Sequence, residues 1–406
     1  MIIESVRASK IHNSRGEETI SVALDTKAGR VLASAPSGKS RGKNEAVPFS
    51  EKGIDFSISF ANAMGKKLAA EKTSFSKFED LEKFENIIKA YDKTKNWAVM
   101  GGNTVFAFES AILKAIALAD EKDLWKSLNE NAKNLPMPVG NCIGGGQHAR
   151  QDVKSDIQEF LFIPKTKRFI DAYFINLQAY KDAKQRILEK DELWRGELTD
   201  EKAIASSLKV EQVLEIMENV SEKLKSKFGS ELRIGMDMAS SALFKDGKYH
   251  YKNPKESITS EEQIEYLLEI LKKHEVFYLE DPLQEDDFSG FSKLLLRVKS
   301  KTLIVGDDLT CTQPARLLEA IKNKSINAAI VKPNQNGSLL ETKKFVDIAK
   351  KNGIIPIISH RSGETMDSTI ADLAVAWNIP FIKTGILGKE RFAKLHRLLK
   401  IEREIR

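Results

Sequence analysis

Six apolar runs in the second half of the chain each end at an ionisable residue, and this pattern constrains the fold more than any other feature. The runs read RIGMD, VFYLED, LIVGDD, AAIVK, IIPIISH and FIK, and segments of helical periodicity separate them. Strands that alternate with helices predict parallel β/α units, and a ring of such units forms a barrel. The carboxyl ends of barrel strands face one pocket, so six residues are expected to meet there: Asp237, Glu280, Asp307, Lys332, His360 and Lys383.

Three carboxylates beside two ammonium groups indicate a bound cation. Asp237, Glu280 and Asp307 would approach one point from three strands, and oxygen ligands suit Mg²⁺, which takes about six of them. Taken alone, each acid is better read as a polar strand end that caps a neighbouring helix. Because Lys332 and Lys383 follow on later strand ends, a metal site that acts on an anionic substrate is the better interpretation.

The basic residues suggest how such a site would work. A metal ion and a second ammonium would lower the pKa of Lys332 and make it usable as a general base, while Lys383 would stabilise charge that develops on the substrate. Arg361 can hold a phosphate or carboxylate through two N–H groups, and Ser362 adds a hydroxyl donor. A core histidine beside a surface arginine is the alternative for this stretch. The run GGGQH would deliver His148 to the pocket, although alone it is an ordinary turn.

The chain is long enough for two domains, since 406 residues exceed the about 250 that a barrel needs. Alternating residues predict a three-stranded meander over 2–9, 18–25 and 30–35, and helical periodicity follows from about 56 to 121. Prolines and glycines then mark a boundary. We therefore expect an N-terminal α+β domain over 1–133 and a C-terminal β/α barrel over 134–406.

One helix boundary inside the barrel has its own signal. Ser260 followed by Gln263 predicts a capping box at the start of a helix over 261–274, with the next strand at 276.

Composition excludes several classes of protein. Hydrophobic residues make up 41% of the chain and charged residues 30%, which excludes a mostly disordered protein. The net charge of +6 has no basic block, so nucleic-acid binding is not expected as the main function. No apolar run approaches the about 18 residues of a membrane span and no signal peptide is recognised, so we expect no membrane insertion and a cytoplasmic location. Cys142 and Cys311 are far apart and are expected to be packing residues.

The sequence resembles the enolase family along nearly its whole length. The stretches that carry the resemblance occur in the family's order: NSRG (13–16), PSGKSRG (36–42), QEF (158–160), IGMD (234–237), YLEDP (278–282), VGDDL (305–309), KPNQNGS (332–338), SHRSGET (359–365), IKTG (382–385) and the tail ERFAKLHRLLKIERE. The resemblance implies an enolase-type barrel that dehydrates 2-phosphoglycerate reversibly to phosphoenolpyruvate. It also implies two Mg²⁺ ions per active site and at least a homodimer.

The resemblance implies a role for each candidate residue. Lys332 would remove the proton beside the substrate carboxylate, and Lys383 would contact that carboxylate and the enolate it becomes. Glu159 and Glu201 would form the acid pair opposite the base, with Glu201 assisting loss of the hydroxyl. The other implied positions are Asp237, Glu280 and Asp307 for the first Mg²⁺, Ser40 on the flap (37–42) for the second, Arg361 and Ser362 for the phosphate, Gly38 for further contact with the substrate, and His148 and His360 as pocket lining.

Two loops depart from the family pattern. Lys202 and Ala203 follow Glu201 where the family has two glycines, and neither takes a positive φ cheaply, so this loop is expected to run differently. The interval between His148 and Glu159 is longer than is usual in the family.

The flap departs as well, because Lys39 and Arg41 stand where the family has small neutral residues. Their charge would either strengthen the attraction of phosphate or hold the flap on other acids.

Two other functions stay open from the sequence. One is a reaction of the same superfamily on an α-hydroxy acid without phosphate, which Arg361, Ser362 and Ser40 argue against. The other is a diverged relative that keeps the fold and acts as a binding or scaffold protein. The altered loops favour that alternative, and the intact metal and base positions oppose it.

Overall fold

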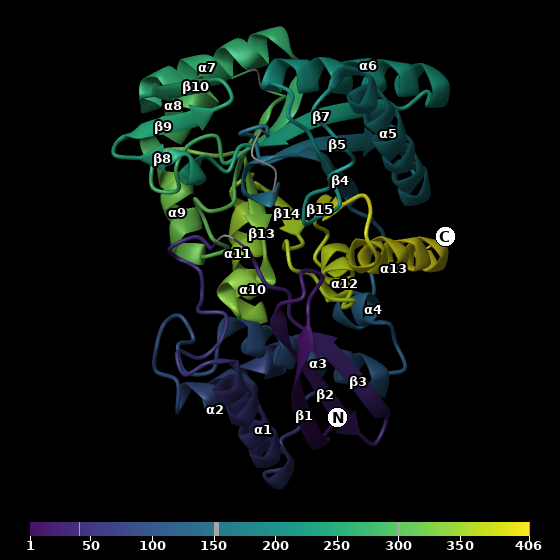
Figure 1. The fold of residues 1–406 in the computed structure, drawn as a ribbon. Helices are drawn as coiled ribbons and strands as arrows, with labels where there is room; N and C mark the ends of the chain where they lie inside the picture. The colour runs from purple at the N-terminus through teal and green to yellow at the C-terminus, as the bar shows by residue number, and fades with distance from the viewer. Residues whose placement is uncertain (40, 150–153, 299–300, 406) are drawn as a thin grey trace.

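Eight strands close into a barrel in the computed structural model, which describes residues 1–39, 41–149, 154–298 and 301–405. The strands pair in the order β15-β14-β13-β12-β11-β7-β5-β4, and β15 pairs with β4 to close the ring (Figure 1). This confirms the predicted barrel. Its strands are β4 (Met137–Gly144), β5 (Glu159–Lys165), β7 (Glu231–Asp237), β11 (Val276–Glu280), β12 (Leu303–Gly306), β13 (Ala328–Val331), β14 (Ile355–Ser359) and β15 (Phe381–Gly385).

One strand of the barrel contradicts the prediction of parallel β/α units. β5 is antiparallel to both of its neighbours, β4 and β7, whereas the strands from β7 through β15 to β4 pair in parallel. The described residues between β4 and β5 form a short 3₁₀ helix (Gly146–His148) and no crossover helix. Antiparallel neighbours need no crossover, so the chain turns back directly.

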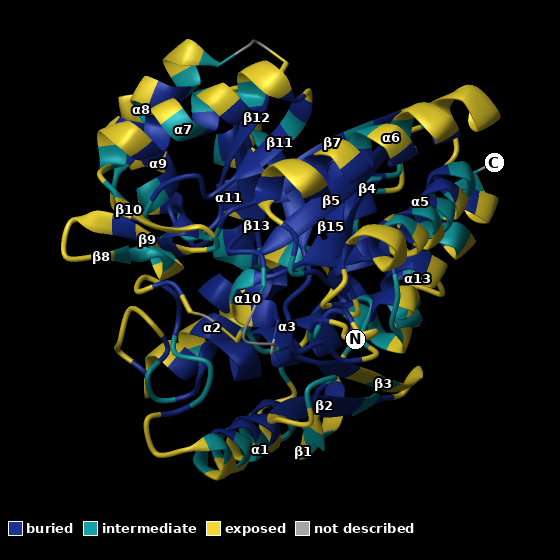
Figure 2. Ribbon diagram, turned by 45° about the horizontal axis from the view of Figure 1, so that its top comes forward, coloured by how far each residue is buried: buried dark blue, intermediate teal, exposed yellow. Residues whose placement is uncertain are grey.

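Helices surround the barrel, and most of them bury one face and expose the other, as the dark blue and yellow ribbons in Figure 2 show, whereas Thr369–Ala376 is buried on all sides. They are α5 (Phe169–Lys190), α6 (Val210–Phe228), α7 (Ser260–Lys273), α8 (Phe288–Arg297), α9 (Pro314–Asn323), α11 (Leu339–Lys351), α12 (Thr369–Ala376) and α13 (Lys389–Ile405). Smaller elements are β6 (Ile204–Ala205), β8 (Phe244–Lys245), β9 (Lys248–Lys252), β10 (Lys255–Ile258) and α10 (Pro333–Asn336).

Alternate residues of the strands form a separate apolar core that fills the barrel. Its members include Val139, Leu161, Ile163, Tyr278, Val305, Ile330, Ile357 and Phe381. The barrel is therefore packed along its axis, and a pocket is left at the ends of the strands.

The N-terminal segment forms the expected α+β domain. Its antiparallel meander consists of β1 (Ile3–His12), β2 (Glu18–Thr26) and β3 (Gly29–Ser34). The accompanying helices are α1 (Ile54–Ala70), α2 (Leu81–Lys89), α3 (Gly102–Ala119) and α4 (Leu124–Leu128). Among the described residues, α3 is the helix long and apolar enough to cross a membrane, but it is 83% buried inside the protein, against β2 and β3. A core helix passes the same test, so this is weak evidence for a membrane span.

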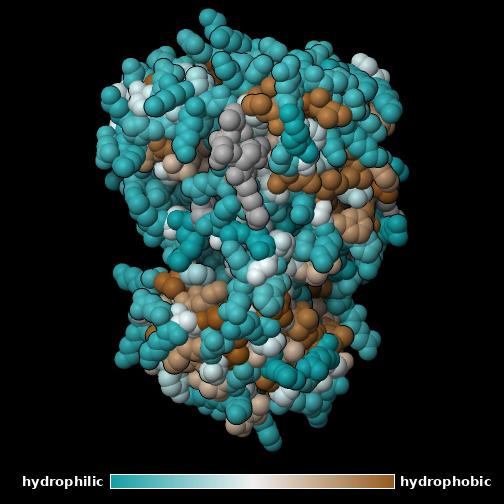
Figure 3. Space-filling model, viewed as in Figure 1, coloured by the Kyte–Doolittle hydropathy of each residue, from teal (hydrophilic) through white to brown (hydrophobic). Residues whose placement is uncertain are grey.

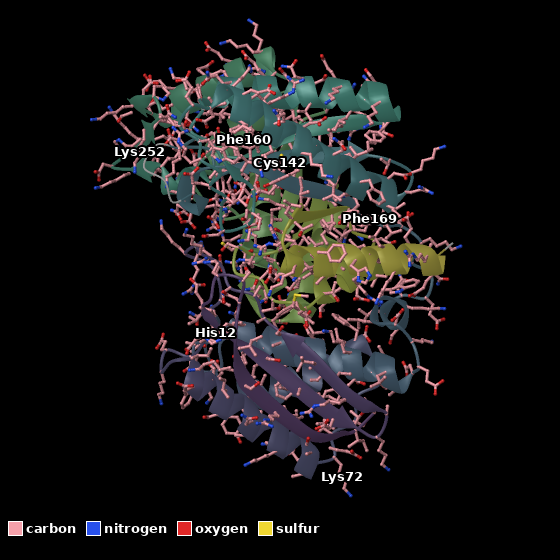
Figure 4. The ribbon with its side chains drawn as sticks, turned by 45° about the vertical axis from the view of Figure 1, so that its right-hand side comes forward. His12, Lys72, Cys142, Phe160, Phe169 and Lys252 are labelled. Atoms are coloured by element: carbon pink, nitrogen blue, oxygen red, sulfur yellow. The ribbon has the colours of Figure 1, made fainter. Side chains whose placement is uncertain are left out.

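Both cysteines are buried and free, as expected for packing residues. Burial raises the pKa of both thiols. Figure 4 shows Cys142 with Phe160 among the barrel strands, whereas Lys72 marks the far tip of the N-terminal domain. Hydrophilic residues cover most of the face seen in Figure 3, with smaller hydrophobic patches between them.

The N-terminal domain meets the carboxyl ends of the barrel strands through its loops. Ser37 forms a β-bridge with Gly363, in the loop after β14. The backbone N–H of Ala46 donates to the carbonyl of Gln335, after β13, at 2.7 Å. Segments far apart in the sequence thus enclose one pocket.

Candidate active site

The ionisable residues at the strand ends converge as the sequence predicts. Asp237 and Glu280 end the adjacent strands β7 and β11 and are register partners. Asp307, Lys332 and His360 directly follow β12, β13 and β14, and Lys383 lies within β15. One pocket is lined by Asp237, Asp307, Lys332, His360 and Lys383. Glu280 is fully buried and reaches this group through Lys383.

Lys383 is the centre of a buried cluster of acids. Its Nζ donates to Asp237 Oδ2 and to both oxygens of Glu280, each at 2.8 Å, and lies 3.1 Å from Glu159 Oε2. Burial lowers the pKa of Lys383, but the surrounding carboxylates outweigh burial and raise it well above its usual value. The ammonium is therefore held charged where the acids meet.

Glu280 shows the cost of placing acids together away from water. Burial, followed by the charge of Asp237, raises the pKa of Glu280 to about 8. The hydroxyl of Tyr278, the first residue of the matching stretch YLEDP, donates to the same carboxylate. A positive charge at this point would stabilise Glu280 as a carboxylate.

Lys332 forms an ion pair with Asp307. Burial acts to lower the pKa of Lys332, but the charge of Asp307 outweighs burial and raises it. Burial likewise acts to raise the pKa of Asp307, and the ammonium groups of Lys332 and Lys383 lower it overall. The expected lowering of the Lys332 pKa is therefore not found in this arrangement, because the nearest charge to its ammonium is a carboxylate.

Three more predicted residues, His148, Glu159 and Glu201, meet His360 on one side of the pocket. His148 Nδ1 lies 3.6 Å from Glu159 Oε1 and 3.9 Å from Glu201 Oε1, and His360 Nε2 lies 3.2 Å from Glu201 Oε2. Burial raises the pKa of Glu159 well above its usual value. For Glu201, burial acts in the same direction, but His360 and His148 outweigh it and lower its pKa. The two glutamates are thus held in different electrostatic environments.

The Glu201 loop reaches the pocket although glycines are missing from it. Lys202 itself takes the left-handed conformation, with φ 66°, and Glu201 is buried beside it. Asn141 Nδ2 donates to Glu201 Oε2 at 3.0 Å. The loop therefore accepts local strain at Lys202 and still presents the carboxylate.

Arg361 and Ser362 are buried and line the pocket together with Gly38 and Lys39 of the flap. Ser362 Oγ accepts from the backbone N–H of Lys39 at 2.9 Å and from Arg15 Nη1 at 3.0 Å. Ser40 lies outside the described residues. The predicted phosphate contacts are therefore grouped, and Arg15 joins them from the N-terminal domain.

Comparison with known proteins decides the family. The family model for the N-terminal domain of enolase matches residues 3–128, and the model for the enolase C-terminal TIM barrel domain matches residues 132–406. The chain belongs to the enolase family.

Relatives named enolase align with this chain over its whole length. The enolases of Methanosphaera stadtmanae and Methanothermobacter thermautotrophicus are each 39% identical over 408 residues, which cover 100% of this chain and 97% of each relative. The enolase of Picrophilus torridus is 35% identical over 403 residues, which cover 99% of both chains. These matches give no support to a scaffold function.

The enolase family implies a divalent metal, and the donors in this pocket fit one. Asp237, Glu280 and Asp307 are buried carboxylates whose charges are balanced here by lysine ammonium groups, so the site is built to receive positive charge. Carboxylate oxygens of Asp281, Asp307 and Asp308 also lie within 4.8 Å of one another. Asp281 accepts the backbone N–H groups of Asp307 and Asp308, each at 2.9 Å, and thereby orients Asp307. Hard oxygen donors of this kind suit a divalent cation.

Sequence reasoning missed several residues of this enolase pocket. Glu45 binds both Nη atoms of Arg361, and Gln335 Nε2 donates to Asp307 Oδ1 at 3.3 Å. Gln335 lies inside the matching stretch KPNQNGS, which was a signal available in the sequence. Glu45 lies three residues after the flap, and nothing local to it points to Arg361. Arg391 of α13 is also buried and donates to the carbonyls of Arg361 and Ser362 at 3.2 and 2.7 Å.

Proposed function

We propose that this protein catalyses the Mg²⁺-dependent, reversible dehydration of 2-phospho-D-glycerate to phosphoenolpyruvate. The observation that carries the proposal is that one pocket is lined by Lys332, Lys383, Glu159, Glu201 and the pair Arg361–Ser362. A base, an acid and a phosphate-binding group are the parts that this elimination needs.

The proposed roles follow from the position of each group. Lys332 takes the proton next to the substrate carboxylate, and Lys383 holds the carboxylate and the negative charge that grows on it. Glu201, with Glu159 beside it, assists departure of the hydroxyl, while His148 and His360 orient these acids. Arg361 and Ser362 hold the phosphate, with Gly38 closing on the substrate from the flap.

Asp237, Glu280 and Asp307 would hold the first Mg²⁺, and Ser40 would contribute to the second. Bound there, the two dications would supply positive charge next to the carboxylate as its α-proton is removed. Lys332 forms an ion pair with Asp307 in the structure. A cation bound to the Asp307 carboxylate would partly neutralise its charge, and the pKa of Lys332 would be raised less.

The experiment that tests this function is formation of phosphoenolpyruvate from 2-phosphoglycerate, followed by ultraviolet absorbance with and without Mg²⁺. Activity that needs both Mg²⁺ and the phosphate of the substrate is the expected result. A non-phosphorylated α-hydroxy acid is the matched control substrate. Turnover of that acid, or no turnover of either, would refute the proposal.

The broader organisation belongs to the same proposal. The domain boundary near 133–134 is supported by family matches that end at 128 and begin at 132. We also expect a homodimer or larger homo-oligomer in the cytoplasm, which light scattering and cell fractionation would test.

A further inference from the structure

The carboxylate of Glu45 forms an ion pair with the guanidinium of Arg361 in the structure. Arg361 Nη1 donates to Glu45 Oε2 at 3.0 Å, and Nη2 donates to Oε1 and Oε2 at 3.1 and 3.0 Å. The side chains are 4% and 5% exposed, so water screens this pair little. Glu45 comes from the segment that follows the flap, and it lines the pocket together with Ser362.

A phosphate held by Arg361 needs the same atoms. Arginine binds phosphate most strongly through two parallel N–H donors, and here the donors of both Nη atoms point at a carboxylate. A phosphate that approaches Arg361 also comes within a few Å of the charge on Glu45, which repels it.

Glu45 also accepts hydrogen bonds from other donors, which would hold its carboxylate in place if some of its contacts with Arg361 were lost. Its Oε1 accepts the backbone N–H of Gly42 at 3.1 Å and Gln335 Nε2 at 3.3 Å. A buried carboxylate that keeps hydrogen bonds from two neutral donors is less costly than one left without any. An anion could therefore replace Glu45 as the partner of Arg361 without leaving the Glu45 carboxylate without hydrogen bonds.

We propose that Glu45 competes with the substrate phosphate for the guanidinium of Arg361 and thereby limits how tightly the pocket holds phosphate. This inference rests on the proposed role of Arg361 in the reaction. By weakening the bound state, Glu45 favours release of the phosphorylated product and discriminates against weaker anions, which displace it less well.

Binding of inorganic phosphate tests the competition without requiring turnover. Calorimetric titration should show that Glu45→Gln binds phosphate more tightly than the wild type by a factor of at least about ten, because a charge a few Å from the phosphate is removed. The matched control is Glu285→Gln, a buried acid whose carboxylate accepts the backbone N–H of Lys43, next to the flap, at 3.1 Å. Its phosphate affinity should stay near the wild-type value. Arg361→Gln should abolish phosphate binding, which would place the binding site at Arg361.

A second variant covers the case in which Glu45→Gln does not fold. Glu45→Asp keeps the charge but is too short for the two-atom contact, so it should bind phosphate more tightly than the wild type and less tightly than Glu45→Gln. Unchanged or weaker phosphate binding in the folded Glu45 variants would overturn the proposal. An equal gain in Glu285→Gln would also overturn it, as a general charge effect. If the wild type binds phosphate at Arg361 but forms no phosphoenolpyruvate, the proposed function is refuted. The competition between Glu45 and phosphate is still tested, because the titrations do not depend on turnover.

Discussion

Lys39 of the flap and Asp200 of the Glu201 loop form an ion pair, with Nζ 2.8 Å from Oδ2. The same ammonium donates to the carbonyl of Gln147 at 2.7 Å, beside His148. The sequence left open whether the flap charges attract phosphate or hold the flap on other acids. In the structure Lys39 holds the flap on an acid, Asp200. One side chain thus joins the flap to the Glu201 loop and to the residue that precedes His148.

The pair predicts how salt affects the enzyme. In Asp200→Asn the charge of Lys39 is no longer neutralised, so kcat/KM should be higher at low salt and should fall more steeply with ionic strength than in the wild type. Lys39→Met leaves the charge of Asp200 unpaired and should flatten the slope, whereas the double variant Lys39→Met/Asp200→Asn removes both charges and should keep nearly the wild-type slope. Initial rates between about 20 and 300 mM salt would measure this. A slope in the double variant that is clearly flatter than that of the wild type would show that Lys39 steers the substrate directly.

Lys332→Ala should abolish turnover while Mg²⁺ binding stays nearly intact, because the base acts on the substrate and the metal is held by carboxylates. Loss of a general base alone costs about 10² to 10⁴ in rate. Exchange of the substrate α-proton with solvent, followed by NMR, is the direct measurement. Lys322→Ala, at an exposed position of α9, is the control and should keep full activity. Exchange that survives in Lys332→Ala would assign the base elsewhere.

Asp307→Asn should keep the fold and weaken Mg²⁺ binding, since an amide oxygen lacks the negative charge that a hard dication favours. Calorimetric titration with Mg²⁺ measures this, with Asp286→Asn as the control at a half-exposed acid nearby. Equal affinity in wild type and Asp307→Asn would mean that the strand-end acids are structural.

Local patterns predicted the barrel well because each strand carries its own apolar run. They failed at β5, whose run QEFLFI is as apolar as the others and does not reveal its direction. They also misplaced one helix cap by a residue. The capping box of α7 is Thr259 with Glu262, not Ser260 with Gln263, because two successive hydroxyl residues both have a partner three positions later.

The predicted site residues had signals of their own at strand ends or in family motifs. Glu45 did not, because its role depends on Arg361, which lies 316 residues away in the sequence. Arg15 and Ser362 are likewise 347 residues apart. Contacts of this kind arise only when the N-terminal domain docks on the barrel, and no periodicity or spacing within either segment encodes them.

Glu109 of α3 provides a prediction about stability at the contact between the two domains. It is fully buried, and its Oε2 accepts the backbone N–H of Leu339 at the start of α11, at 2.6 Å. Burial, followed by the charge of the neighbouring Glu85, raises the pKa of Glu109 well above its usual value. The folded state therefore binds a proton that the unfolded chain releases above pH about 4.3.

The sign follows from this difference in proton binding. A carboxyl with a raised pKa destabilises the fold progressively as pH rises above its unfolded value, by at most about 1.4 kcal/mol per pH unit. Glu109→Gln keeps the acceptor for Leu339 without the titrating group, so its Tm should exceed that of the wild type increasingly between about pH 5 and 8. Near pH 4 the two should be similar. Glu79→Gln, an exposed acid of the same domain, is the control and should show no such trend. Parallel Tm curves for wild type and Glu109→Gln would mean that Glu109 stays ionised in the folded protein.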